Sequence, residues 1–94
     1  MYYVIICIDK PGQLETRMAN RPDHVAYVGG FRDQLLIADP FLDDDGETMV
    51  GSMLIMEFAS QADAETFAAG DPYNKAGVFE SVTIRPWKKT LPAD

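Results

Sequence analysis

Hydrophobic residues divide the chain into four strand-like stretches separated by helix-like ones. Residues 2–8 are consecutive apolar residues rich in β-branched and aromatic types, and Asp9-Lys10-Pro11-Gly12 then signals a turn. Because this stretch does not alternate polar with apolar residues, both faces of the strand are expected to be covered. Three further strands are predicted at residues 34–38, 49–58 and 78–84, of which 49–58 is the longest and is expected to be central.

Two helical runs are expected between the first and second strands. Residues 13–20 place Leu14 and Met18 at i and i+4, which predicts an apolar stripe. Pro22 is expected to break or re-aim this helix and to begin a second run that continues through Phe31. The Gly29-Gly30 pair weakens that second run by roughly 1 kcal/mol per glycine relative to alanine.

A further helix is predicted after the third strand. Ser60 is a good N-cap, and an acidic residue follows in the first turn. Ala62, Phe67 and Ala68 are expected to form its inner side, and Gly70 to end it. Asp71-Pro72-Tyr73 then restarts a single helical turn, with Asp71 as its cap.

Prolines are expected to end two of the strands. Asp39-Pro40 follows the second strand, and Arg85-Pro86 follows the fourth, from which residues 85–89 are expected to leave the sheet. Between the second and third strands, residues 41–48 are expected to form a loop with an Asp-Gly turn signal.

The resulting order is β-α-β-β-α-β within one domain spanning residues 1–94. This order predicts an α+β, ferredoxin-like fold, in which one antiparallel sheet carries both helices on the same face. The other sheet face is then left bare although its strands are apolar. A second copy of the chain is the expected cover, so we predict a homodimer that associates through this face.

The chain is acidic, with a formal net charge of −7, which disfavours nucleic acid and anionic membrane surfaces as partners. Cys7 is the only cysteine, so neither an intrachain disulfide nor a cysteine-based metal site is expected. The acidic stretch at 43–47 lacks the alternating spacing of a calcium loop, and no metal site is predicted there. The N-terminal residues lack the basic region of a signal peptide, so a cytoplasmic protein is expected.

His24 is the only histidine and the first candidate for chemistry. With Pro22 at the first position of a helix, His24 is expected in the first helical turn, near the positive end of the backbone dipole. That position favours a neutral imidazole, which can accept a proton near pH 7. The alternative is a partly exposed histidine that makes one hydrogen bond and has no chemical role.

Several motifs, in this order along the chain, resemble the YciI-like proteins: Tyr2-Tyr3-Val4-Ile5, Arg21-Pro22-Asp23-His24, Gly51-Ser52, Asp71-Pro72-Tyr73 with Ala76-Gly77-Val78-Phe79, and Arg85-Pro86-Trp87. The resemblance implies a ferredoxin-like fold of the dimeric α/β-barrel group, with a His–Asp pair in a cleft. One branch of that family is a dehydrochlorinase that acts on chlorinated hydroxyquinols. This chain has Ala38-Asp39-Pro40 where the family usually has Ala-Gly-Pro, and its 43–47 loop is shorter and more acidic.

In the light of this resemblance, His24 and Asp71 are the predicted catalytic residues. Asp71 is expected to act as a helix cap through one carboxylate oxygen and to accept the His24 ring N–H with the other. Such pairing would hold the imidazole in one tautomer.

Four other residues are predicted to bind the ligand: Ser52, Arg21, Tyr73 and Asp39. Each has an ordinary structural alternative. Ser52 can bond the strand backbone, Asp39 can serve only as a turn former, and Tyr73, like Trp87, can close the core instead of a pocket. Arg17 and Arg21 can share a helix face with His24 if Pro22 leaves the helix intact, and their ordinary alternative is a solvated face.

The first functional hypothesis is a cofactor-independent acid/base enzyme, of the lyase or isomerase type. It would transfer a proton on a small oxygenated substrate, cyclic or aromatic in character, with His24 oriented by Asp71. The alternative is a dimeric accessory module that binds a small molecule without converting it. Both hypotheses require a small-molecule ligand and no cofactor.

Overall fold

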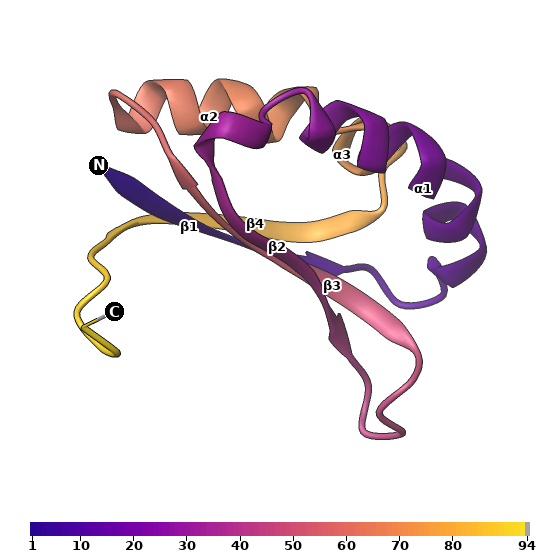
Figure 1. The fold of residues 1–94 in the computed structure, drawn as a ribbon. Helices are drawn as coiled ribbons and strands as arrows, with labels where there is room; N and C mark the ends of the chain where they lie inside the picture. Colours follow the sequence, from indigo (N-terminus) through magenta and orange to yellow (C-terminus); the bar gives the residue numbers. More distant parts are fainter. Residues whose placement is uncertain (94) are drawn as a thin grey trace.

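The computed structural model describes residues 1–93, which form a four-stranded antiparallel sheet with helices on one face (Figure 1). The elements are β1 (Tyr2–Asp9), α1 (Leu14–Gly29), the 3₁₀ turn η1 (Arg32–Gln34), β2 (Leu35–Leu42), β3 (Met49–Glu57), α2 (Gln61–Gly70), α3 (Pro72–Lys75) and β4 (Phe79–Trp87). The strand order is β2-β3-β1-β4, with all pairs antiparallel. The predicted α+β, ferredoxin-like fold is therefore confirmed. Within the described residues, no helix is both long enough and apolar enough to cross a membrane.

The core lies between the sheet and the helices. Alternate residues of β1 (Tyr3, Ile5 and Cys7) are buried on this side, because successive side chains of a strand point to opposite faces. They pair in register with Met56, Leu54 and Ser52 of β3, in that order. Phe58, Phe67, Val78 and Phe79 extend the same buried cluster.

Gly51 permits a close approach of β1 and β3 beside the core. A Cβ atom at this position would lie 2.5 Å from the Cys7 carbonyl oxygen and 3.1 Å from the Phe41 ring. Any larger residue would push the two strands apart. Gly51 therefore helps to hold the next residue, Ser52, against β1 in the buried part of the sheet.

Helix α1 is continuous through Pro22, so the predicted break is wrong. Pro22 and Met18 both lie on the exposed side of the helix, where water can hydrate the Met18 carbonyl that lacks its usual N–H partner. The predicted stripe of Leu14 and Met18 is also wrong, since these residues are 44% and 47% exposed. The inward face carries Arg17 and Val28 instead, and tertiary contacts along this face outweigh the local cost of proline.

Strands β2 and β4 continue through the prolines that were expected to end them. Pro40 pairs with Ser52 and Pro86 with Tyr3, so both lie within the sheet. Because β2 and β4 are the two edge strands, each needs hydrogen bonds on one side only and can accommodate a residue without an N–H.

Helix α2 begins as predicted, with the Ser60 hydroxyl accepting the Asp63 backbone N–H at 3.2 Å. Its inner side consists of Ala64, Phe67 and Ala68, whereas Ala62 is exposed. Ala64 replaces Ala62 on the inner face because it lies one helical turn before Phe67 and Ala68.

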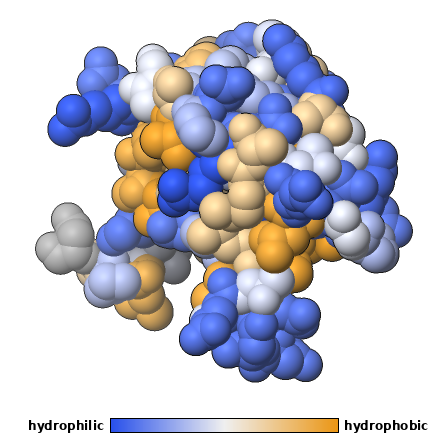
Figure 2. Space-filling model, turned by 90° about the vertical axis from the view of Figure 1, so that its right-hand side faces the viewer, coloured by the Kyte–Doolittle hydropathy of each residue, from blue (hydrophilic) through white to orange (hydrophobic). Residues whose placement is uncertain are grey.

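The sheet face opposite the helices is only partly covered. By strand alternation it carries Tyr2, Val4 and Ile6 of β1, together with Met53 and Ile55 of β3. The acidic tip of the β2–β3 hairpin, residues 43–47, forms the hydrophilic projection at the bottom of Figure 2, with hydrophobic surface above it.

Candidate functional site

Helix α1 presents Arg17, Arg21 and His24 to one cavity. Their spacing of i, i+4 and i+7 places them on one side of the helix because the helix is unbroken at Pro22. The cavity has a volume of about 80 Å³. Its lining consists of Arg17, Arg21, His24, Val25, Ala38, Asp39, Pro40, Met49, Ser52, Leu54 and Tyr73.

His24 contacts Asp71, which is 47 positions further along the chain. The His24 Nδ1 atom lies 2.8 Å from Asp71 Oδ1, and the two side chains are 13% and 2% exposed. A carboxylate is an acceptor, so this contact favours the tautomer in which Nδ1 carries the hydrogen. The other ring nitrogen, Nε2, then has a free lone pair.

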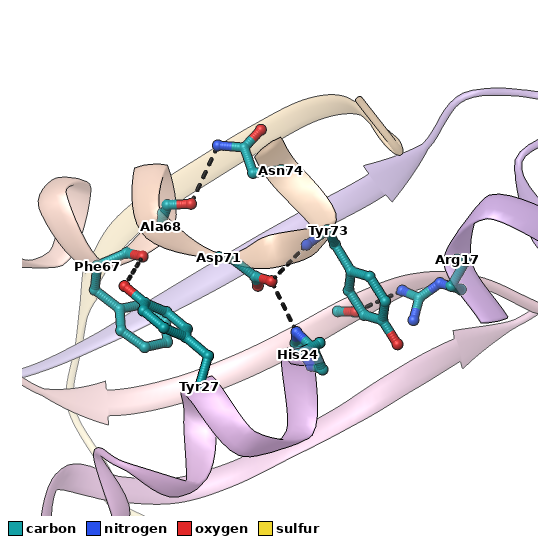
Figure 3. Close-up of polar contacts among 9 residues, drawn as sticks. Arg17, His24, Tyr27, Phe67, Ala68, Asp71, Tyr73 and Asn74 are labelled. Atoms are coloured by element: carbon teal, nitrogen blue, oxygen red, sulfur yellow. Dashed lines mark hydrogen bonds and ion pairs between the residues drawn. The ribbon is translucent and has the colours of Figure 1, made fainter. Parts of the chain in front are cut away.

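Asp71 combines two roles through the same oxygen atom. Its Oδ1 accepts the Tyr73 backbone N–H at 2.9 Å, which caps α3, and also lies within hydrogen-bond distance of His24 (Figure 3). The expected division between the two carboxylate oxygens is therefore wrong. A single carboxylate oxygen has enough lone pairs to accept from both donors. The expected first-turn position of His24 is also wrong, because His24 lies in the second half of α1.

A tyrosine one turn beyond His24 holds α1 against α2. The Tyr27 hydroxyl donates to the Phe67 carbonyl at 2.8 Å (Figure 3). A Cβ atom on Gly70 would lie 2.5 Å from the Tyr27 hydroxyl oxygen, so glycine is required for this approach. Burial raises the pKa of Tyr27, with Asp71 adding to the shift. The neutral Tyr27 hydroxyl therefore holds α1, next to His24, against the end of α2, next to Asp71.

Tyr73 forms a wall between two cavity residues. Its ring stacks on the His24 imidazole, with centroids 4.0 Å apart and planes 15° apart. The Arg17 guanidinium carbon lies 4.4 Å from the same Tyr73 centroid, and Figure 3 shows the tyrosine between the two side chains. Burial raises the pKa of Tyr73, while Arg17 opposes that shift. The Tyr73 hydroxyl thus stays protonated near neutral pH.

Arg17 is buried, although a solvated face was its expected alternative. It is 2% exposed, with Nε donating to Asp9 Oδ2 at 2.8 Å and Nη2 donating to Ser52 Oγ at 2.5 Å. The sequence does not identify Asp9 as a site residue, because the stretch Asp9-Lys10-Pro11-Gly12 indicates only a turn. The one usable signal was the helical spacing of Arg17 from His24.

The other predicted ligand-binding residues differ in their placement. Ser52 and Tyr73 are buried at the cavity wall, and Arg21 lies at its exposed rim. Asp39 borders the cavity, but its register opposite Met53 directs its side chain to the sheet face away from the helices. Binding roles for these four residues stay predictions.

Two other residues lie apart from the proposed chemistry. Trp87 packs edge-on against Tyr2, with ring centroids 6.0 Å apart, and does not line the cavity. Cys7 is buried, and this burial raises the pKa of its thiol to about 12, with Asp71 adding to the shift. A thiolate nucleophile is therefore disfavoured.

Within residues 1–93, no group of three histidine, cysteine, aspartate or glutamate side chains is arranged to hold a metal ion.

The fold and this cavity define a ferredoxin-like α+β protein with a histidine–carboxylate contact at a small polar pocket. Residues 1–88 match the model of the YCII-related domain. The chain belongs to this family, as the sequence motifs indicated. Relatives covered over their full length include Protein YciI from Escherichia coli, 41% identical, and an uncharacterized protein from Haemophilus influenzae, 38% identical; each match spans 97% of this chain.

A solved structure adds a chemical comparison. The 5-chloro-2-hydroxyhydroquinone dehydrochlorinase TftG from Burkholderia phenoliruptrix AC1100 is 33% identical to this chain, with a TM-score of 0.89 over 96% of both chains. That enzyme was solved in complex with 2,5-dihydroxybenzoquinone. An antibiotic biosynthesis monooxygenase, 15% identical with a TM-score of 0.56, shares the fold alone.

Proposed function

We propose that this protein is a cofactor-independent acid/base enzyme that transfers a proton on a small, oxygenated ring. The observation that carries the proposal is the 2.8 Å contact between His24 Nδ1 and Asp71 Oδ1 at the wall of a cavity. Asp71 would hold the imidazole in the tautomer that leaves Nε2 free to accept a proton.

The proposed step begins with removal of a proton from a ring hydroxyl, or from a carbon next to a carbonyl. The proton passes to His24 Nε2. The electron pair of a broken O–H bond stays on the hydroxyl oxygen, whereas that of a broken C–H bond moves onto the carbonyl oxygen and gives an enolate. In an isomerisation the proton returns at another position. In an elimination the electron pair expels a leaving anion, so a proton and that anion depart together without any oxidant or reductant.

Two features of the site support this chemistry. Arg21, Ser52 and Tyr73 offer hydrogen-bond donors to an enolate oxygen, and they line the same cavity as His24. The apolar residues Val25, Met49 and Leu54 can contact the faces and edges of a ring. The dehydrochlorinase that shares this fold was crystallised with such an oxygenated ring, which supports the substrate class.

A homodimer is part of the proposal. The sheet face carrying Val4, Ile6 and Met53 is apolar and only partly buried, and a second copy of this face would cover it. Light scattering on the purified protein tests this arrangement, and the mass of a single chain at micromolar concentration would contradict it.

The test of the reaction uses 5-chloro-2-hydroxyhydroquinone as substrate and 2,5-dihydroxybenzoquinone as binding probe. The wild-type protein is expected to release chloride above the uncatalysed rate. His24→Ala should retain binding of the probe within a few-fold, whereas turnover should fall by about 10²–10⁴-fold, the usual contribution of a general acid/base.

The matched control is Asp23→Ala, which alters an exposed neighbour outside the cavity and should keep wild-type turnover. Equal turnover in His24→Ala and the wild type would exclude the acid/base role. Tight probe binding without turnover by the wild type would instead favour the non-catalytic binding module.

A further inference from the structure

The hydrogen bonds of Arg17 determine which way the Ser52 hydroxyl can point. A guanidinium has only donors, so in the Arg17–Ser52 contact Arg17 donates and Ser52 Oγ accepts. The Ser52 hydrogen must therefore be directed elsewhere. Among residues 1–93, no acceptor for that hydrogen is found, and Ser52 lines the cavity.

Arg17 is itself held in place by Asp9. The Nε donates to Asp9 Oδ2 at 2.8 Å, with side-chain exposures of 2% and 5% for the two residues. The second Asp9 oxygen, Oδ1, is buried and makes no hydrogen bond within the described part of the chain. A buried ion pair with an unused acceptor contributes little to stability. We therefore look for its role in the positions that it imposes on Arg17 and on the Ser52 hydroxyl.

We propose that Asp9 and Arg17 are positioning residues that turn Ser52 into the oxyanion donor of the cavity. This inference rests on the proposed function, to which it adds the group that stabilises the developing enolate oxygen. The positive charge of Arg17 polarises the Ser52 hydroxyl, which makes it a stronger donor than an ordinary serine.

The same cavity then offers both a proton acceptor and a hydrogen-bond donor. His24 Nε2 is the acceptor for the proton, and the Ser52 hydroxyl is the donor for the oxygen that becomes negative. Tyr73 lies between His24 and Arg17 and keeps their side chains on separate sides of its ring (Figure 3). The ligand class that fits is a ring compound with an ionised or ionisable hydroxyl next to a carbonyl.

The experiment is a mutant cycle with 2,5-dihydroxybenzoquinone, whose hydroxyl groups are vinylogous acids and therefore ionise readily. Asp9→Asn/Arg17→Gln removes both charges of the pair and leaves the net charge unchanged. Its affinity is compared with those of the wild type, Ser52→Ala and the triple variant, after thermal unfolding has shown that each variant is folded.

This arrangement, in which Asp9 holds Arg17 and Arg17 orients the Ser52 hydroxyl, is called the relay below. It predicts strong coupling between the Asp9–Arg17 pair and Ser52 in ligand binding. Ser52→Ala should weaken binding about tenfold, the size expected for a hydrogen bond to a charged group. Asp9→Asn/Arg17→Gln should weaken binding to a similar extent in the wild type and by less than about twofold when Ser52→Ala is already present. Equal losses in both backgrounds would show that Asp9 and Arg17 act independently of Ser52 and would overturn the proposal.

The matched control is Arg21→Gln, which removes a positive charge from the same helix face without contacting Ser52. Any effect of Arg21→Gln should be the same with and without Ser52→Ala. Coupling as large as that of the Asp9–Arg17 pair would attribute the effect to general electrostatics and would overturn the relay.

A ligand-free measurement separates this inference from the proposed function. Neutron diffraction from deuterated crystals should show the Ser52 hydroxyl deuteron directed into the cavity. A deuteron directed at a backbone carbonyl would overturn the relay even if the ring compound binds. Absence of probe binding by the wild type would contradict the proposed ring ligand, and the deuteron position would still decide the relay.

Discussion

Helix α1 borders two different hollows. Its middle turns, from Arg17 to Val25, line the polar cavity of about 80 Å³, whereas its last turn borders a groove of about 420 Å³ lined by Tyr27, Phe31 and Phe67. Half of the residues that line the larger hollow are aromatic. The groups that can transfer a proton or stabilise an anion gather in the smaller one.

The two hollows therefore differ in role: the aromatic one stabilises the fold, and the polar one holds the groups proposed for chemistry. Phe67 lies within 4.8–5.6 Å, centroid to centroid, of Tyr27, Phe31 and Phe58, so the aromatic cluster ties α1 and α2 to the sheet. Behind the polar cavity, the buried carboxylates of Asp9 and Asp71 contact the cavity residues Arg17 and His24, and such buried charges are costly in a small protein. The aromatic cluster stabilises the framework on which those polar groups are held.

Gly70 lies where the two regions meet, and substituting it has the largest expected effect on stability. Gly70→Ala would place a Cβ atom 2.5 Å from the Tyr27 hydroxyl oxygen and would displace the Tyr27 ring from Phe67. We expect a loss of about 1–3 kcal/mol in the free energy of unfolding, typical of overpacking. Because Asp71 is the next residue, the same variant should also weaken ligand binding.

Urea unfolding and probe titration together measure these two effects. Ala69→Ser, at the exposed neighbouring position of α2, is the control and should leave both quantities unchanged. A destabilised Gly70→Ala with fully retained ligand affinity would show that the aromatic cluster and the cavity are independent of each other.

A smaller effect is expected from Cys7, which lies on the core face of β1 opposite Ser52. Burial raises the pKa of the folded thiol from 9.0 to about 12, so between these values only the unfolded chain ionises. Ionisation of the unfolded chain favours unfolding. The contribution of Cys7 to stability is therefore complete below pH 9 and is lost at up to about 1.4 kcal/mol per pH unit above it.

The measurement is the free energy of unfolding of the wild type and Cys7→Ala at pH 8 and pH 10. The wild type should be the more stable at pH 8, because the alanine leaves a small cavity, and its advantage should shrink at pH 10. A constant difference at both values would show that the thiol ionises equally in the folded and unfolded chains.

The sequence predicts most of the features that depend on local chemistry. Ser60 and Asp71 cap helices as expected, because a cap involves only the residue and the next few backbone N–H groups. The order of strands and helices follows from hydrophobic patterning, which is also a local property. The resemblance to a known family adds the pairing of His24 with Asp71, which no local pattern could supply.

The incorrect predictions concern features that depend on distant neighbours. Pro22 and Pro40 lie inside elements because one faces water and the other belongs to an edge strand, and neither fact can be read from adjacent residues. Arg17 is buried because its partners, Asp9 and Ser52, come from two different strands. Such contacts appear only when the chain is folded.

The most direct test of the central claim is the tautomer of the His24 ring, measured by ¹⁵N NMR on the ligand-free protein at neutral pH. We predict that Nδ1 carries the hydrogen in the wild type, since Asp71 Oδ1 accepts it. Asp71→Ser keeps a side chain that can cap α3 but withdraws the carboxylate, and it should shift the ring toward the Nε2–H form. An Nε2–H tautomer in the wild type, or the same spectrum in both proteins, would contradict an imidazole oriented by Asp71.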